Sequence, residues 1–155
     1  MSFRISALPS ADFEHLFGMP DEELARRNIV RKTVDQHPGF PCRVSLADAE
    51  IGETVLLLNH EHQPANSPYR ATHAIFVREG AREAHPQIGE IPAVLRRRLL
   101  SVRAFDEAGM MLDADAVMGE ALEPVLERFL ADDKVAYLHL HNAKPGCYAA
   151  RVDRA

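Results

Sequence analysis

The sequence predicts an α+β fold with a mostly antiparallel sheet of about seven or eight strands and two or three helices. Apolar and polar residues alternate in several short segments, which is the pattern of half-buried strands. Two such segments flank Glu107-Ala108-Gly109, as the strands of a β-hairpin do. One stretch, residues 120–132, has the apolar period of a helix. Hairpins with few helices favour the α+β class.

Short elements are expected in the first third of the chain. Ser10 can cap a helix that Gly18 ends, and the acidic residues after Pro20 suit the first turn of a second helix. A glycine and two prolines in residues 37–42 prevent regular structure there. We expect strands at residues 3–8, 28–34 and 43–46, helices at 10–17 and from about 20, and a loop at 37–42.

Two strands are expected in the middle of the chain. Residues 54–60 are aliphatic and β-branched with no breaker, and they form the clearest strand of the sequence. A polar loop follows from Glu61 to about Thr72, and a second strand covers residues 73–78. The stretch 79–92 is expected to be a long loop.

The last third contains the hairpin, the helix and two further strands. The hairpin strands are expected at residues 99–105 and 110–116, with Met110, Leu112 and Ala114 on one packing face. Pro124 has to lie in the first turn of the helix or kink it. The apolar stripe of that helix consists of Leu122, Val125, Leu126, Phe129 and Leu130. Strands at 135–141 and 147–152 are joined by a tight turn at 144–146.

Length and charge limit the classes of protein. A chain of 155 residues with 46% apolar residues is expected to form a single domain over residues 1–155. A formal net charge of -5 argues against nucleic-acid binding, because acidic surfaces repel phosphate. No stretch reaches the ~20 apolar residues of a membrane span. Without a secretory signal in the first residues either, we expect a cytoplasmic protein that does not bind membranes.

Histidines stand in two His-x-His pairs, His60 with His62 and His139 with His141. Residues i and i+2 of a strand point to the same face, so each pair can offer two imidazoles to one metal ion. The alternative is that these histidines are the polar face of a half-buried strand. The sequence does not show whether the two pairs meet.

Two cysteines, Cys42 and Cys147, are expected to be free thiols, because the chain has no CxxC motif and is expected in a reducing compartment. Arg43 beside Cys42 favours the thiolate, so Cys42 is a candidate nucleophile with His141 as the histidine that acts on it. The alternative is that both cysteines are chemically inert.

A third group of residues suggests an anion site. Arg43 and Arg70 can bind a carboxylate or phosphate through paired hydrogen bonds. The alternative is that each arginine forms an ordinary salt bridge at the surface. The side chains that we expect to line the site with them are Tyr69, Asn142 and Cys147.

Several blocks of the sequence together resemble the bacterial family catalogued as domain of unknown function 1203. The blocks are Gly39–Arg43, Gly52–Leu58, Ser67–Arg70, Ala74–Arg78, His139–Ala143 and Gly146–Cys147. The resemblance implies a small bacterial cytosolic protein, and it implies no reaction, cofactor or catalytic residue. It directs attention to the candidate residues that lie inside these blocks.

Three function classes remain open at this point. A domain that binds a polar or anionic small molecule is favoured by the arginines. A small enzyme would use a histidine-bound metal or Cys42. A homodimeric interaction protein needs no special motif. The sequence names no cofactor and no substrate.

Overall fold

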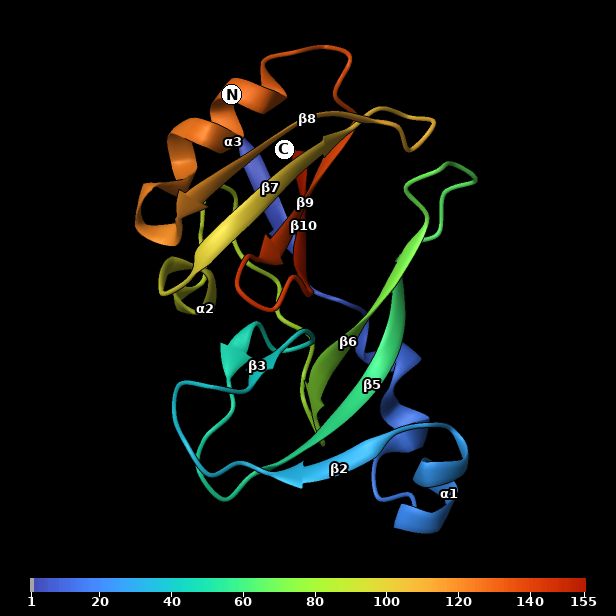
Figure 1. Cartoon of the computed structure of the whole chain (residues 1–155). Coiled ribbons are helices and arrows are strands. Elements are labelled where there is room, and N and C mark those ends of the chain that lie inside the picture. Colours follow the sequence, from blue (N-terminus) through green and yellow to red (C-terminus); the bar gives the residue numbers. More distant parts are fainter. Residues whose placement is uncertain (1) are drawn as a thin grey trace. The chain divides into compact units, whose positions relative to one another are not determined.

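The computed structural model describes residues 2–155 and confirms the α+β class. In this range it has ten strands in two five-stranded, mostly antiparallel sheets, and three α-helices. The strands outnumber the seven or eight expected from the sequence, because some are only two residues long. The chain divides into two compact units (Figure 1), and the prediction of one domain stays a prediction. The first unit contains residues 2–6, 61–73 and 85–155, and the second contains 7–60 and 74–84.

The first unit is built on an antiparallel sheet with the strand order β1-β10-β9-β7-β8. Helix α3 lies against strands β7 and β8 of this sheet (Figure 1). The predicted hairpin is therefore correct, and Gly109 in its turn has a positive φ that favours glycine. The bounds are β1 Phe3–Ser6, α2 Ala93–Arg96, β7 Leu99–Phe105, β8 Met111–Met118, α3 Leu122–Leu130, β9 Tyr137–Asn142 and β10 Tyr148–Arg154.

The two sides of β9 have different compositions. Leu138 and Leu140 alternate with His139 and His141, and all four side chains are buried. Successive residues of a strand point to opposite faces, so the leucines and the histidines lie on different faces of the sheet. In the β7–β9 register, the leucine face of β9 lies on the same side of the sheet as the buried apolar residues Leu100 and Val102 of β7. The histidine face is therefore the one available for chemistry.

A bulge in β10 changes which of its residues share that face. Tyr148 pairs with His141 and Ala150 pairs with Leu140, so the register shifts between them. The extra residue in a bulge changes the direction of neighbouring side chains. Here it allows Tyr148 to lie beside the two histidines of β9 while Ala150 faces the core.

The second unit contains most of the other sheet, which has the strand order β2-β5-β6-β3-β4. Its core gathers apolar residues from both ends of this unit, including Phe13, Leu24, Leu56 and Ile75. Strands β5 and β6 have residues in both units. The bounds are α1 Asp21–Arg26, β2 Val30–Thr33, β3 Pro41–Cys42, β4 Ala47–Asp48, β5 Thr54–Gln63 and β6 Ala71–Arg78, with 3₁₀ turns at Ser10–Asp12 and Glu14–Leu16.

Four local predictions are wrong. Residues 43–46 are a turn rather than a strand, because β3 and β4 pair on either side of them and Leu46 has a φ of 49°. The strand expected at 54–60 continues to Gln63. The helix expected at residues 10–17 is two 3₁₀ turns, Ser10–Asp12 and Glu14–Leu16. Met110, Leu112 and Ala114 are exposed, because β8 is the edge strand of its sheet.

No helix among residues 2–155 has the length and apolar character that crossing a membrane requires.

Candidate metal centre

Three histidines meet on the polar face of the first sheet: His62, near the end of β5, and His139 and His141 on β9. Each offers a ring nitrogen, and these nitrogen atoms lie within 4.8 Å of one another. His139 and His141 are 3% and 1% exposed, whereas His62 is half-buried. All three residues belong to the first unit. The structure thus joins one member of the first His-x-His pair to both members of the second.

A backbone carbonyl fixes the orientation of His141. Its Nδ1 lies 3.0 Å from the carbonyl oxygen of Gly146. A carbonyl can only accept a hydrogen bond, so Nδ1 carries the proton and Nε2 has the free lone pair. That Nε2 is buried and has no hydrogen-bond partner among the described residues. Metal-binding histidines are commonly oriented in this way by a bond from the other nitrogen.

The turn that supplies this carbonyl depends on Gly146. Gly146 has a φ of 81°, a region that favours glycine, and its N–H donates to the carbonyl of Asn142 at 2.8 Å. The tight turn predicted at 144–146 is thereby confirmed. It returns the chain so that β10 pairs with β9 and Tyr148 stands opposite His141.

Burial keeps the rings of His139 and His141 neutral. Burial first, and then neighbouring positive groups, lower the pKa of each from 6.5 to about 3. At neutral pH both rings therefore keep a lone pair, which is the form that binds metals. Nδ1 of His139 is also buried without a hydrogen-bond partner among the described residues. His139 and His141 thus each hold a buried nitrogen atom that has no hydrogen-bond partner among residues 2–155.

Aromatic rings surround the cluster. Tyr148 stacks on His62 with a centroid separation of 5.5 Å and stands edge-on to both histidines of β9, at 5.2 and 5.8 Å. Phe105 and Tyr137 lie 5.1 and 5.2 Å from the ring of His139. Gln63 next to His62 donates to the Tyr137 hydroxyl at 2.9 Å. These rings restrict the rotamers of the histidines and exclude water from one side of the cluster.

Strand β7 adds two polar residues that the sequence analysis did not select. The β7–β9 register places Ser101 opposite His141 and Arg103 opposite His139. Directly opposed residues share a face, so both side chains lie beside the cluster. The positive charge of Arg103 lowers the pKa of both histidines, which agrees with this placement. The alternation of the predicted strand 99–105 contained a signal for these residues, because Ser101 and Arg103 alternate with buried apolar residues.

His60 does not join the cluster. It belongs to the second unit, where its ring lies 6.1 Å from that of Phe13. His73 is near the cluster, since its charge lowers the pKa of His141, but it is outside the group of three.

Cys42 lies in the second unit and is 1% exposed. In the described part of the chain, its Sγ accepts hydrogen bonds only from the backbone N–H groups of Ser45 and Arg78, at 3.5 and 3.2 Å. No histidine is therefore within hydrogen-bond distance of this thiol to act as a base. The nucleophile hypothesis gains no support from this geometry.

The predicted anion-site arginines each have a local partner. Arg43 is 2% exposed, lies in the second unit and donates to the carbonyl of Pro41. Arg70 is exposed, lies in the first unit and pairs with Glu61 at 3.2 Å. Both guanidinium groups have a partner inside their own unit, and the role of the two arginines in binding an anion stays a prediction.

The other three predicted ligand-binding residues lie in the first unit. Tyr69 is 38% exposed, and its ring stands edge-on to Phe105. Asn142 is buried, and its Nδ2 lies 3.7 Å from Sγ of Cys147, which is buried and forms no disulfide. Asn142 follows His141 along β9 and shares the face of Leu140. It is therefore on the opposite side of the sheet from the histidines.

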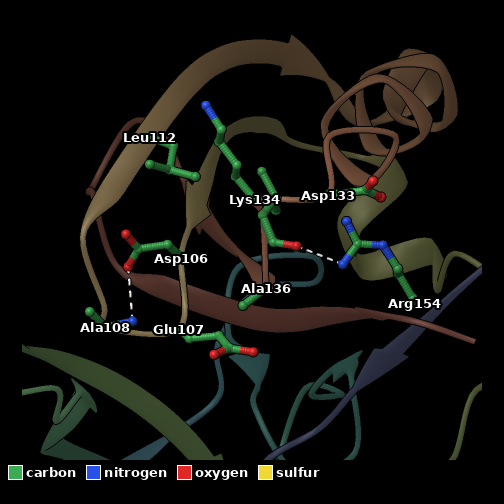
Figure 2. Close-up of a pocket in the computed structure, with 9 residues that line it drawn as sticks. Asp106, Glu107, Ala108, Leu112, Asp133, Lys134, Ala136 and Arg154 are labelled. Atoms are coloured by element: carbon green, nitrogen blue, oxygen red, sulfur yellow. Dashed lines mark hydrogen bonds between the residues drawn. The ribbon is translucent and has the colours of Figure 1, made fainter.

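A pocket of about 620 Å³ lies elsewhere in the first unit (Figure 2). Two of its charged residues already have structural roles. Asp106 accepts from the N–H groups of Ala108 and Met110 in the hairpin turn, and Arg154 donates to carbonyls at the end of α3 and in the segment after it. None of the predicted site residues lines it.

Comparison with known proteins places the chain in a family. The model of the family described as "Protein of unknown function (DUF1203)" matches residues 39–154. The chain belongs to this family. The part that DUF1203 matches includes all three clustered histidines, Tyr148 and Arg103. No curated protein and no solved structure matches the chain.

Proposed function

We propose that this DUF1203 protein binds one divalent transition-metal ion through His62, His139 and His141. The observation that carries the proposal is the buried Nε2 of His141, which the Gly146 carbonyl orients toward two further imidazoles. A histidine with a purely structural role would use its buried nitrogens in hydrogen bonds inside the protein. Here the nitrogens converge on one another instead.

The dimensions of the cluster suit a small metal ion. With Zn–N bonds of ~2.0–2.1 Å, the nitrogens around a tetrahedral zinc lie about 3.4 Å apart. The three nitrogens lie within 4.8 Å of one another, so they need to approach by no more than roughly 1.4 Å, which small ring rotations supply. Neutral imidazole suits zinc, copper, iron and nickel, whereas magnesium and calcium prefer oxygen ligands.

A set of three histidines also supports a catalytic role. Structural zinc sites usually have four protein ligands, whereas catalytic ones have three and leave a position for water or substrate. A water molecule at that position becomes acidic enough to supply hydroxide near neutral pH. The enzyme class therefore agrees best with this site, and metal-assisted hydrolysis is the reaction type that the ligand set favours.

The test is metal binding by the full chain. Metal-free protein is titrated with Zn²⁺, Ni²⁺, Fe²⁺ and Mn²⁺, and elemental analysis follows desalting. We expect one ion per chain in the wild type and at least a 100-fold weaker affinity in the double variant His139→Gln/His141→Gln, since two of three ligands are gone. His15→Gln is the matched control, because His15 is exposed and lies outside the cluster.

Circular dichroism shows whether the double variant is folded. If it is folded and still binds one ion as the wild type does, the three-histidine site is wrong. A wild type that binds none of the four ions overturns the proposal as well.

A further inference from the structure

Arg103 has an unusual environment for a charged residue in a strand. It is half-buried beside the histidine cluster, and burial lowers the pKa of its guanidinium. Among residues 2–155 no carboxylate pairs with it, and its one hydrogen bond is from Nε to Oγ of Ser101, at 3.2 Å. Removing a charge from water without a counter-ion costs free energy, so a fold usually pairs such a group.

The hydrogen bond to Ser101 leaves the outer edge of the guanidinium open. Because Nε is used, the two terminal nitrogens Nη1 and Nη2 present a fork of N–H donors with no partner among the described residues. Such a fork matches the two oxygens of a carboxylate or phosphate. The other arginine near the cluster, Arg151, is already paired with Asp153 at 2.8 Å. Of these two arginines in the described part of the chain, Arg103 is therefore the one without a carboxylate partner.

We propose that Arg103 binds an oxyanion group, carboxylate or phosphate, of a substrate whose reacting part lies at the histidine centre. This inference rests on the proposed metal site for the place of reaction, and on Arg103 alone for the anion. Arg103 and Ser101 stand opposite His139 and His141 in the register, so a small molecule can reach both groups at once. The half-buried guanidinium favours an anion at this face, because the nearby carboxylate of Asp153 is engaged by Arg151 and does not pair with Arg103.

The test measures anion binding separately from metal binding. Calorimetric titrations with inorganic phosphate and with acetate are made on metal-free and on Zn²⁺-loaded protein, for the wild type and for Arg103→Gln. We expect the wild type to bind one of the two anions and Arg103→Gln to bind it at least 10-fold more weakly while it retains one Zn²⁺ per chain. The anion that binds more tightly identifies the substrate's oxyanion as phosphate or carboxylate.

Two further variants make the test specific. Arg4→Gln removes the same charge from another strand of the same sheet, at an exposed position, and is expected to leave both affinities unchanged. Arg103→Lys retains the charge without the fork and is expected to bind the anion with intermediate affinity. If Arg103→Gln binds both anions as the wild type does, or the wild type binds neither at millimolar concentration, the inference is overturned.

The two proposals fail in different ways. Anion binding that depends on Arg103 in a protein that binds no metal supports the role of Arg103 and overturns the metal site. One bound Zn²⁺ with no anion binding overturns only the role of Arg103.

Discussion

Single buried nitrogen atoms are the strongest functional signal in this protein. Leaving a buried donor or acceptor unsatisfied costs about 1–3 kcal/mol. The fold accepts this cost at Nδ1 of His139 and at Nε2 of His141. Apolar side chains at the same positions would avoid it, so the histidines reduce stability in the absence of a ligand. A bound metal ion removes the cost, and this links the stability of the first unit to metal binding.

The sequence was sufficient to identify the histidines as candidate ligands. It was insufficient to predict which of them meet in the fold. The His-x-His spacing indicates that His139 and His141 share a face, because that follows from the period of one strand. The partnership with His62 depends on the fold of a segment more than 70 residues away in sequence, so local pattern carries no information on it. Tyr148 reaches the cluster through a bulge, and Arg103 reaches it through the register between two strands.

An ion pair in the second unit gives a prediction for pH. Arg31 donates to Glu79 at 2.6 Å and lowers the pKa of that carboxyl below its ordinary value of 4.5. The folded state therefore keeps Glu79 ionised at pH values where the unfolded chain is protonated. The resulting stability is fully present above about pH 4.5 and is lost as the pH falls through the lower, folded-state pKa.

Glu79→Gln is accordingly expected to destabilise the protein at pH 7 and to differ less and less from the wild type as the pH falls below about 4.5. Urea unfolding of both proteins between pH 7 and pH 3 measures the difference in free energy of unfolding. Glu14→Gln is the control, because Glu14 is exposed. A difference between Glu79→Gln and wild type that is constant over this range contradicts the prediction.

Helix α3 is the element that the sequence predicted best. Its apolar period is a local property, and Pro124 falls in its first turn as expected. The structure buries four of the five predicted stripe residues and leaves Val125 half-buried. By contrast, the turn at 43–46 was missed because it is imposed by β3, which pairs with β4 on one side and with β6 in parallel on the other. Sequence period cannot show that pairing.

Packing of α3 supplies a prediction for stability. Leu126 is fully buried, and Leu126→Ala leaves a cavity that is expected to cost about 2–5 kcal/mol in free energy of unfolding. Glu127→Ala, on the exposed side of the same helix, is expected to cost less than about 0.5 kcal/mol. Chemical denaturation of both variants measures this. Equal effects of the two substitutions would mean that α3 does not pack as described.

Two strands connect the compact units at the scale of the whole molecule. Residues of β5 and of β6 belong to both units, so the chain passes from one unit to the other within a strand. Unfolding one unit therefore removes part of two strands that the other unit shares. We therefore retain the single-domain prediction and expect one cooperative transition.

The distribution of aromatic residues makes this testable. All three tyrosines, Tyr69, Tyr137 and Tyr148, lie in the first unit, and the chain has no tryptophan. Tyrosine fluorescence of the wild type therefore reports on the first unit, and Phe17→Trp adds a selective reporter to the half-buried surface of the second. Coincident denaturation midpoints are expected. Two separate midpoints, in a variant whose circular dichroism transition matches that of the wild type, contradict a single domain.

The alternation of leucine and histidine along β9 has a consequence for evolution. One strand holds the packing residues and the reactive residues at interleaved positions, so the two sets can vary independently. A lineage can exchange ligands on one side of the backbone and keep the interior that supports them. Diversification of metal preference or substrate within DUF1203 then requires few coordinated mutations. A library randomised only at the positions of β7, β9 and β10 that lie on the histidine face should contain mostly folded proteins.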